Sequence, residues 1–339
     1  MEGFERIVIE VTEACQHACI HCYNFWSHDR APVNSPESLT RSEIRDLVRK
    51  VKRDTPIKEV GLSGGEPLLR DDLPEIVGDL VDEGLSVVVI TNGVLLSDRR
   101  VSRFPQGTIF EVTLFSTDAG LHDRIAGRRG AFRKVVGGAV CVQRHRCRLA
   151  LAVVLNRLNA HDVRRTMELG IALGADAILL NRVNLSHLTF PIADRLVPTL
   201  AQLKEALDAA ESVVRDYQAM VAVSVPIPPC LLDLDPYKGL HFGWCPRGGK
   251  DAYYTISHNG LLRPCNHASV VLGDLRRRDF AEIVEDEHTR QFWEPIPPDC
   301  RKCQHPLAGL CRGGCPAASH ECYGSRDHWD PIIDVIERR

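Results

Sequence analysis

Short apolar runs alternate with amphipathic segments along the first two-thirds of the chain. The apolar runs, rich in Val, Ile and Leu, predict strands at residues 6–12, 57–62, 85–91, 109–115, 148–155 and 176–183. Between these runs, apolar residues recur at three- and four-residue spacing opposite charged ones, which predicts helices at 42–52, 72–83, 132–145, 162–174 and 200–217. Strands that alternate with helices in this way predict parallel βαβ units, in either a doubly wound sheet or a barrel-like one.

The pattern changes after about residue 220, where proline becomes frequent and the periodic segments become short. Nearly 120 residues without long elements are expected to bury little apolar surface. Seven cysteines lie between residues 245 and 322 of this part. We therefore expect metal sites to hold the last third of the chain together.

Composition and charge exclude several classes of protein. With 44% hydrophobic and 26% charged residues, the chain is typical of a globular protein. Its net charge of −3 argues against a nucleic-acid surface, and the basic clusters at 144–146 and 276–278 are interpreted as solvated surface. No apolar run is long enough to span a membrane, and the first residues do not resemble a signal peptide. The 13 cysteines therefore predict metal or redox chemistry in the cytoplasm rather than disulfides.

Three cysteines follow directly on the first predicted strand, as Cys15, Cys19 and Cys22. A loop at the carboxyl end of a barrel strand lies on the usual active-site face of such folds. Three thiolates at this spacing suit a [4Fe–4S] cluster whose fourth iron is left open for a substrate or cofactor. On spacing alone, a zinc site completed by His17 or His21 is the alternative.

The second predicted strand ends in Ser63-Gly64-Gly65-Glu66-Pro67. The two glycines are expected to let a ligand approach the backbone, and the neighbouring carboxylate suits an ammonium group. Together with the cysteine triplet, this loop resembles the radical S-adenosylmethionine (SAM) superfamily. In that family the open iron binds the amino and carboxylate groups of SAM, whose reductive cleavage yields a 5′-deoxyadenosyl radical.

The resemblance covers the first 220 residues and rests on motifs at the ends of the predicted strands. Thr91-Asn92-Gly93, Ser116-Thr117-Asp118 and the Asn156–Asn159 turn follow the third, fourth and fifth strands, as in the family. The resemblance implies that Glu66 accepts the methionyl ammonium and that Ser116 and Asp118 lie near the ribose. The cofactor-binding residues that it implies are Tyr23, Gly64, Gly65, Glu66, Asn92, Ser116, Asp118 and Asn156.

One motif departs from the family pattern. Where related enzymes have D-x-I-R-G, this chain has Ala126 in place of the Arg. Either Arg124 or Arg128 takes over the contact of that Arg, or the contact is absent.

The cysteines of the last third resemble the SPASM extension of this superfamily, which holds two auxiliary [4Fe–4S] clusters. The resemblance implies Cys245, Cys265 and Cys315 as ligands of the first cluster, and Cys300, Cys303, Cys311 and Cys322 as ligands of the second. Because the family's last cysteine normally follows an Asp-Pro pair, here Asp330-Pro331, the residues Asp330, His320 and His328 are alternatives to Cys322. A pair of zinc ribbons is the alternative from spacing alone.

Three cysteines remain outside these motifs. Cys141 and Cys147 are expected to be small buried hydrophobic residues. Cys230 lies in a proline-rich stretch, and we expect it to complete the first auxiliary cluster. A thiol that donates a hydrogen atom to the substrate and a structural residue are the other interpretations of Cys230.

The sequence therefore predicts a partial (β/α)6 barrel at residues 1–220, a SPASM-type domain at 221–322 and a C-terminal tail at 323–339. The resemblance implies a radical SAM oxidoreductase or maturase with one SAM-binding and two auxiliary [4Fe–4S] clusters. Its catalytic cysteines are expected to be Cys15, Cys19, Cys22 and Cys230.

The activity that the resemblance implies is hydrogen-atom abstraction from a C–H bond. The expected substrate is a ribosomal peptide, matured by cross-linking, oxidation or epimerisation in natural-product biosynthesis. A dehydrogenase or epimerase of a small substrate such as an aminoglycoside is an alternative, and so is a non-catalytic zinc-ribbon protein. The expected partners are an electron donor such as a flavodoxin or ferredoxin and, since no peptide-recognition domain is expected before the first strand, a separate leader-peptide-binding protein.

Overall fold

The elements of secondary structure follow the order that the sequence predicts. The computed structural model describes residues 5–26, 33–248 and 252–337. The strands are β1 Arg6–Thr12, β2 Glu59–Gly64, β3 Ser86–Thr91, β4 Ile109–Thr113, β5 Arg148–Leu155, β6 Ala177–Arg182, β7 Val221–Val223, β8 His241–Phe242, β9 Thr255–Ile256, β10 Leu261–Arg263 and β11 Gly273–Asp274. The α-helices are α1 Arg41–Asp54, α2 Leu73–Asp82, α3 Asp98–Val101, α4 Ala119–Ala126, α5 Ala131–Arg144, α6 Val163–Ala172, α7 Ala193–Leu196, α8 Leu200–Tyr217, α9 Phe280–Glu285, α10 Glu287–Trp293, α11 Ala308–Cys311, α12 Pro316–Tyr323 and α13 Pro331–Glu337. Short 3₁₀ helices are η1 Pro67–Leu69, η2 Ala160–Asp162, η3 Phe190–Ile192 and η4 Pro298–Lys302.

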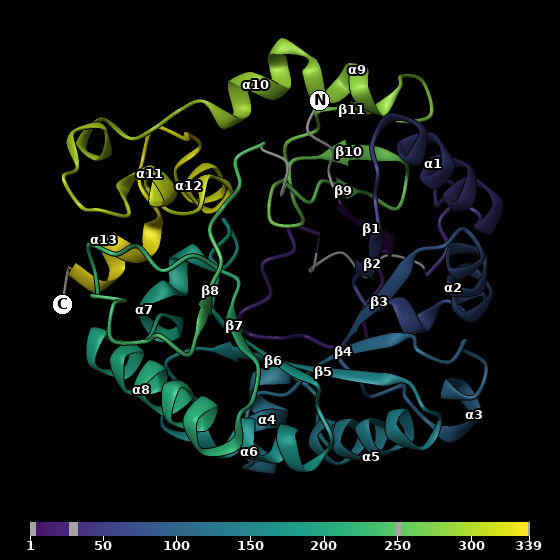
Figure 1. Ribbon diagram of the computed structural model, residues 1–339, viewed down its shortest axis with the longest axis horizontal. Helices are drawn as coiled ribbons and strands as arrows, with labels where there is room; N and C mark the ends of the chain where they lie inside the picture. The colour runs from purple at the N-terminus through teal and green to yellow at the C-terminus, as the bar shows by residue number, and fades with distance from the viewer. Residues whose placement is uncertain (1–4, 27–32, 249–251, 338–339) are drawn as a thin grey trace.

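The strands of the described residues form one open sheet in the order β11-β10-β9-β1-β2-β3-β4-β5-β6-β7-β8. From β1 to β8 every neighbouring pair is parallel. The sheet curves, and helices form an outer ring around it (Figure 1). The prediction of an α/β fold with a parallel, partly closed barrel is confirmed, and β1 to β6 are the six strands that the sequence predicts.

The helix α1 illustrates how the local sequence produces these elements. The side chain of Thr40 accepts a hydrogen bond from the Glu43 backbone, and the Glu43 carboxylate accepts one from the Thr40 backbone at 2.8 Å, which begins the helix. Its buried face consists of Ile44, Leu47, Val48 and Val51. Burial of four such side chains stabilises the packing of α1 on the sheet by up to about 6–12 kcal/mol.

The part of the chain after residue 220 packs at both edges of the sheet. The strands β7 and β8 extend the sheet beyond β6, whereas β9 pairs with β1 at the opposite edge. Tyr254, Phe280 and Ile283 are almost fully buried in the same apolar core as the barrel strands, and Ile332 of α13 joins them. The expectation that this part buries little apolar surface is therefore wrong, because short elements can still add side chains to a core formed by others.

Two buried ion pairs connect this late part of the chain to the barrel strands. Arg263 of β10 bonds to Glu10 of β1, and Arg182 at the end of β6 bonds to Asp330, which precedes α13. The four side chains are at most 3% exposed. Separation of the two parts of the chain would leave each buried charge without its partner, which is strongly destabilising. Each pair therefore fixes how the two parts of the chain pack together.

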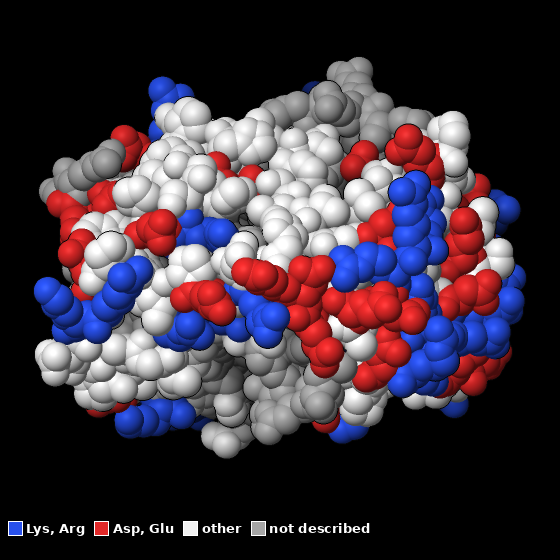
Figure 2. Space-filling model, turned by 90° about the horizontal axis from the view of Figure 1, so that it is seen from above, with Lys and Arg blue, Asp and Glu red and all other residues white. Residues whose placement is uncertain are grey.

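The surface carries charges of both signs. Figure 2 shows a face on which Lys and Arg side chains lie interspersed with Asp and Glu. In the two basic clusters of the sequence, Arg144 pairs with Asp98 at 3.2 Å and Arg276 with Asp274 at 3.5 Å. Among the described residues, none of the helices combines the length and the apolar character that crossing a membrane requires.

Candidate active site

The three cysteines after β1 form one group, which we call the cysteine loop (Cys15, Cys19 and Cys22). The thiols of Cys15 and Cys19 each interact electrostatically with that of Cys22, and the Cys22 amide donates to the Cys19 carbonyl at 3.1 Å. Burial raises the pKa of the Cys15 thiol to about 11 and raises that of Cys19. None of the 13 cysteines, all within the described ranges, forms a disulfide. Three neighbouring soft thiols fit an iron–sulfur cluster, which cysteine thiolates hold.

The C-terminal end of α4 supports the cysteine loop from one side. The Ala18 amide donates to the Ala126 carbonyl at 3.3 Å, and a Cβ on Gly127 would lie only 2.2 Å from the Ala18 oxygen. Gly127 has φ 61°, a conformation that glycine adopts at no steric cost. Arg128 donates to the Gln16 carbonyl at 2.8 Å. Of the two arginines that the sequence offered in place of Ala126, Arg128 is therefore seen to contact the loop.

The glycine pair at the end of β2 lets two segments of backbone approach each other. A Cβ on Gly65 would lie 2.2 Å from the Ala14 oxygen, and a Cβ on Gly64 would lie 2.1 Å from the Thr12 oxygen. The sequence suggested that these glycines make room for a ligand. In the structure they make room for the backbone that leads from β1 into the cysteine loop, so they set the position of that loop.

Glu66 is fully buried directly behind the cysteine loop. Its carboxylate accepts hydrogen bonds from the Leu68 amide at 3.0 Å, the Thr91 hydroxyl at 2.6 Å and the Asn92 amide at 2.8 Å. Burial raises the pKa of Glu66 to about 7. Because a carboxylate offers about four acceptor positions, one position remains for a cationic ligand. The Asn92 side chain lies between this carboxylate and the loop, with its Nδ2 3.9 Å from the Cys15 sulfur.

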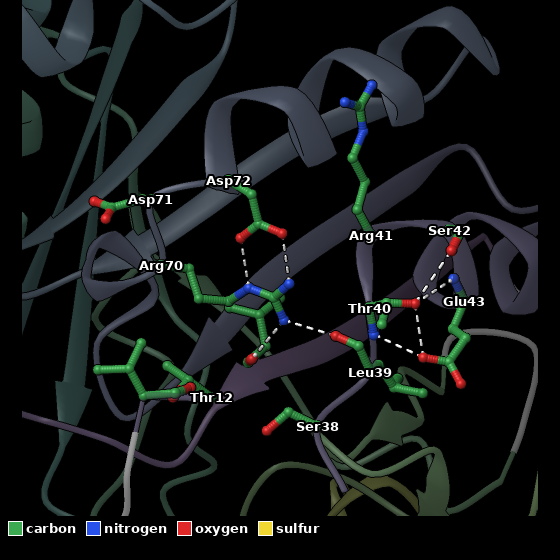
Figure 3. Close-up of polar contacts among 12 residues, drawn as sticks. Thr12, Ser38, Leu39, Thr40, Arg41, Ser42, Glu43, Arg70, Asp71 and Asp72 are labelled. Carbon is green, nitrogen blue, oxygen red and sulfur yellow. Dashed lines mark hydrogen bonds and ion pairs between the residues drawn. The ribbon is translucent and has the colours of Figure 1, made fainter. Parts of the chain in front are cut away.

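The position of this loop is also held by Arg70, which sequence reasoning missed. The Arg70 guanidinium is 4% exposed and donates to the carbonyls of Val11 at 3.1 Å and Leu39 at 2.8 Å. It also forms a two-point contact with Asp72, at 2.9 and 2.7 Å (Figure 3). Val11 precedes the cysteine loop and Arg70 follows Glu66, so this one side chain joins the two segments. Asp71 and Asp72 follow Arg70 directly in the sequence, so Arg70 resembles an ordinary surface charge and carries no local signal of this role.

The predicted residues after β4 and β5 lie at the same carboxyl edge of the parallel strands. The Ser116 hydroxyl donates to Asp162 at 2.6 Å, and Asp118 caps α4 by accepting from the Leu121 amide at 2.7 Å. Asn156 is fully buried and its amide donates to the Asn159 side chain at 2.8 Å. The partner of Ser116, Asp162, also accepts from the Thr117 amide at 2.7 Å and was not singled out from the sequence.

Tyr23 links the cysteine loop to the last third of the chain. Its hydroxyl accepts a hydrogen bond from Asn266 Nδ2 at 2.7 Å, and its ring lies 4.1 Å from that of His267, measured between centroids. Burial raises the pKa of the Tyr23 phenol. Since Asn266 and His267 follow Cys265 directly, Tyr23 spans the space between two groups of cysteines. Asn266 and His267 lie outside any motif, so their contact with Tyr23 depends on the fold.

Three cysteines of the last third line one pocket, which we call the cysteine cavity (Cys245, Cys265 and Cys315). The Cys265 thiol interacts electrostatically with the other two. His267 lines the same cavity, and Asn184 Nδ2 lies 3.7 Å from the Cys315 sulfur. A pocket lined by three neighbouring thiols fits an auxiliary cluster, which is what the sequence predicts for these cysteines.

Three further cysteines form a second group outside this cavity, which we call the outer group (Cys300, Cys303 and Cys311). The Cys300 thiol interacts electrostatically with Cys311 and Cys303. In the described ranges, no three His, Cys, Asp or Glu side chains converge closely enough to hold a single metal ion.

Two cysteines differ from expectation in their neighbours. Cys230 interacts electrostatically with Cys311 and Cys300 of the outer group, and it is not among the residues that line the cysteine cavity. Cys322 interacts with Cys315, whose cavity it does not line. The sequence had associated Cys230 with the first auxiliary cluster and Cys322 with the second. In the structure Cys230 lies near Cys300 and Cys311, and Cys322 lies near Cys315, because Arg182 and Asp330 hold the loop after β7 close to α13.

Comparisons with known proteins agree with this arrangement. The family model of the radical SAM superfamily matches residues 9–170, and that of an iron-sulfur cluster-binding domain, SPASM, matches residues 245–304. The PqqA peptide cyclase of Bradyrhizobium diazoefficiens is 26% identical over an alignment of 341 positions, gaps included. The alignment covers 96% of this chain and 84% of the relative. The enzyme of the same name from Methylocella silvestris is 28% identical, with 97% of this chain and 87% of the relative covered.

Two solved structures share the fold. Streptococcus suis SuiB bound to its precursor peptide SuiA matches with a TM-score of 0.74 and 15% identity, over 97% of this chain and 75% of SuiB. The anSMEcpe protein with bound AdoMet matches with a TM-score of 0.75 and 14% identity, over 98% of this chain and 95% of that protein. At these identities the likeness establishes the fold.

Proposed function

Because the chain belongs to the radical SAM superfamily and carries a SPASM domain, we propose that it matures a ribosomal peptide by removing hydrogen from its C–H bonds. As in that superfamily, its cofactors are SAM and [4Fe–4S] clusters. The observation that carries the proposal is the cysteine loop, whose exposed Cys15 lies beside the buried carboxylate of Glu66 and the side chain of Asn92. Support for a peptide substrate comes from the relatives named PqqA peptide cyclase, which align with nearly the whole chain.

In this proposal the residues of the cysteine loop hold a cluster with an open iron. When bound, SAM and this cluster supply a carbon-centred radical that removes a hydrogen atom from an unactivated C–H bond. Glu66 orients the cofactor by accepting its ammonium group at the remaining acceptor position of the carboxylate. Asn92 holds Glu66 and Cys15 at a fixed relative position, because its backbone amide donates to Glu66 and its side chain contacts the Cys15 sulfur. Ser116 and Asp118, with Asn156, border the site at the ends of β4 and β5.

We propose cross-linking or oxidation as the outcome in preference to epimerisation. Either reaction removes two hydrogen atoms, the second as a proton and an electron, and so needs an electron acceptor near the reacting carbon. Cys245, Cys265 and Cys315 would hold an accepting cluster in the cysteine cavity, which Tyr23 and His267 connect to the cysteine loop.

The proposal also includes partners and a location. Reductive cleavage of SAM requires an electron donor, for which we propose a flavodoxin or ferredoxin. A separate protein is proposed to bind the leader segment of the peptide. Thirteen thiols without a disulfide suit a reducing compartment, so we propose the cytoplasm.

The test uses the full chain, reconstituted with iron and sulfide under anaerobic conditions and then reduced. SAM and candidate precursor peptides are added, and both 5′-deoxyadenosine and peptide mass are measured. We expect 5′-deoxyadenosine together with a peptide that has lost two hydrogen atoms. The variant in which Cys15, Cys19 and Cys22 are all Ala is the control. Absence of 5′-deoxyadenosine would contradict the activity. A peptide that loses no hydrogen in ordinary water, and gains one deuterium at carbon in deuterated water, would indicate epimerisation.

A further inference from the structure

We propose that Cys230 is the fourth ligand of the second auxiliary cluster, together with Cys300, Cys303 and Cys311. This inference rests on the proposed function, because it assigns a ligand to one of its clusters. The three other ligands come from one short segment, whereas Cys230 comes from the loop between β7 and β8, which lies beside α13 (Figure 1).

A chain of hydrogen bonds holds the loop of Cys230 against the segment that carries Cys311. The Pro226 carbonyl accepts from Arg182 Nε at 2.8 Å, and the same guanidinium bonds to Asp330. The Asp330 amide in turn donates to the Gly313 carbonyl at 2.9 Å, two residues after Cys311. Pro226 and Gly313 are thus fixed to one buried ion pair, and the two loops cannot separate without breaking it.

The proline-rich sequence places the Cys230 thiol with little freedom. The Leu231 amide donates to the Pro228 carbonyl at 3.0 Å, which closes a turn with Pro229 and Cys230 at its centre. Two consecutive prolines reduce the number of unfolded conformations, so less entropy is lost when the thiol is held in place. Cys230 is exposed, and a cluster can therefore reach it from the outer group.

The outer group lies on the facing side of this turn. A Cβ on Gly313 would lie 3.5 Å from the Cys300 sulfur, so Cys300 packs against the turn that follows Cys311. Gly313 and Gly314 both have positive φ, at 92° and 83°, which lets the chain turn sharply there. The Cys230 thiol interacts electrostatically with those of Cys311 and Cys300, so it lies near both.

Two other candidates for the fourth ligand, Asp330 and Cys322, have other partners. The Asp330 carboxylate bonds to Arg182 and accepts from the amides of Cys315 at 3.0 Å and Ile332 at 3.2 Å. Cys322 interacts electrostatically with Cys315, which belongs to the cysteine cavity and not to the outer group. With Cys230 as ligand, the second auxiliary cluster has four protein thiolates and no open iron. Such a cluster exchanges electrons and does not bind substrate.

The experiment isolates the auxiliary clusters. In the background Cys15→Ala, Cys19→Ala, Cys22→Ala, the full chain should hold two clusters, or about eight irons. Cys300→Ala and Cys265→Ala in this background identify the electron paramagnetic resonance signals of the outer and the cavity cluster after reduction. We expect Cys230→Ala to alter the signal that depends on Cys300, with a loss of up to about four irons, and to leave the signal that depends on Cys265 unchanged.

Matched variants distinguish the possible outcomes. Cys322→Ala should leave the Cys300-dependent signal unchanged, and Cys230→Ser, which offers an oxygen ligand, should shift that signal while retaining iron. Two unchanged signals in Cys230→Ala, or a change in the Cys265-dependent signal, would overturn the assignment. A background protein that binds zinc and lacks iron and sulfide would instead overturn the proposed function. Because Cys230 is exposed, its substitution should leave the melting temperature of the cluster-free chain unchanged.

Discussion

Replacement of Asp330 by Asn should strongly destabilise the protein. The exchange preserves the size of the side chain but removes the charge that neutralises Arg182, whose guanidinium cannot lose its proton. Arg182 is 1% exposed, so water cannot solvate the charge that is left behind. The pair joins β6 to the segment before α13, and its loss therefore affects the contact between the barrel strands and the last third of the chain.

The size of the effect follows from burial and chain length. Removal of one partner from a buried ion pair costs about 3–5 kcal/mol in free energy of unfolding. Unfolding entropy of about 2.1 cal/mol/K per residue, over 339 residues, gives about 0.7 kcal/mol/K. A loss of 4 kcal/mol should thus lower the melting temperature by about 6 °C. The iron content should fall as well, because the Cys315 amide donates to the same carboxylate at 3.0 Å.

The assay is anaerobic thermal denaturation followed by circular dichroism, at one scan rate for all variants. Asp216→Asn is the matched control: Asp216 pairs with Arg164 at 2.8 Å, but both side chains are more than one-third exposed, so water screens the pair and the change should leave the melting temperature nearly unchanged. The double variant Arg182→Gln, Asp330→Asn should be at least about 2 kcal/mol more stable than the sum of its single changes implies. Additive changes, or a melting temperature of Asp330→Asn within about 1 °C of the parent, would refute the reasoning.

Three further predictions concern the site and the barrel. Replacing Cys15, Cys19 and Cys22 together by Ala should abolish 5′-deoxyadenosine formation and remove about four irons, as measured by chromatography and iron analysis; undiminished product would contradict their role. Glu66→Gln should weaken SAM binding about tenfold to a hundredfold in equilibrium dialysis, because a charged hydrogen bond contributes about 1.5–3 kcal/mol to binding. The iron content should stay unchanged. Burial raises the pKa of Glu111 from 4.5 to about 7. The free energy of unfolding therefore falls as the pH rises from about 4.5, where the carboxyl of the unfolded chain ionises, and the loss is complete above pH 7. Glu111→Gln should therefore stabilise the protein by about 1–3 kcal/mol at pH 8 and by less than about 1 kcal/mol at pH 5; melting curves with equal gains at both would exclude this cause.

The barrel strands were predictable because each of them carries its own signal. Residues 6–12 and 200–217 were predicted with the bounds that β1 and α8 have in the structure. Parallel strands buried on both faces appear as runs of Val, Ile and Leu, and the outer helices show apolar residues on one face. The strands β8, β9 and β11, of two residues each, are too short to show any periodicity.

The long-range contacts of the site could not be read in the same way. The cysteine spacing predicts which residues bind iron, but spacing within a segment does not say which distant segment lies next to it. The association of Cys230 with the outer group depends on the buried pair of Arg182 and Asp330, which are 148 positions apart. The partner of Tyr23, Asn266, is likewise distant, at 243 positions. Such contacts follow from the curvature of the sheet, and a linear pattern does not contain that information.

The pairing of β9 with β1 also has a consequence for how the protein is made. β1 emerges from the ribosome about 240 residues before β9, which at about 5–20 residues per second corresponds to about 10–50 s of synthesis. During that interval β1 has β2 on one side only, and the unpaired backbone groups on its other side form an open strand edge. Open edges with β-branched residues pair readily with other chains. The nascent barrel therefore exposes an edge that can pair with other chains, and chains that stop before residue 255 should accumulate as aggregates.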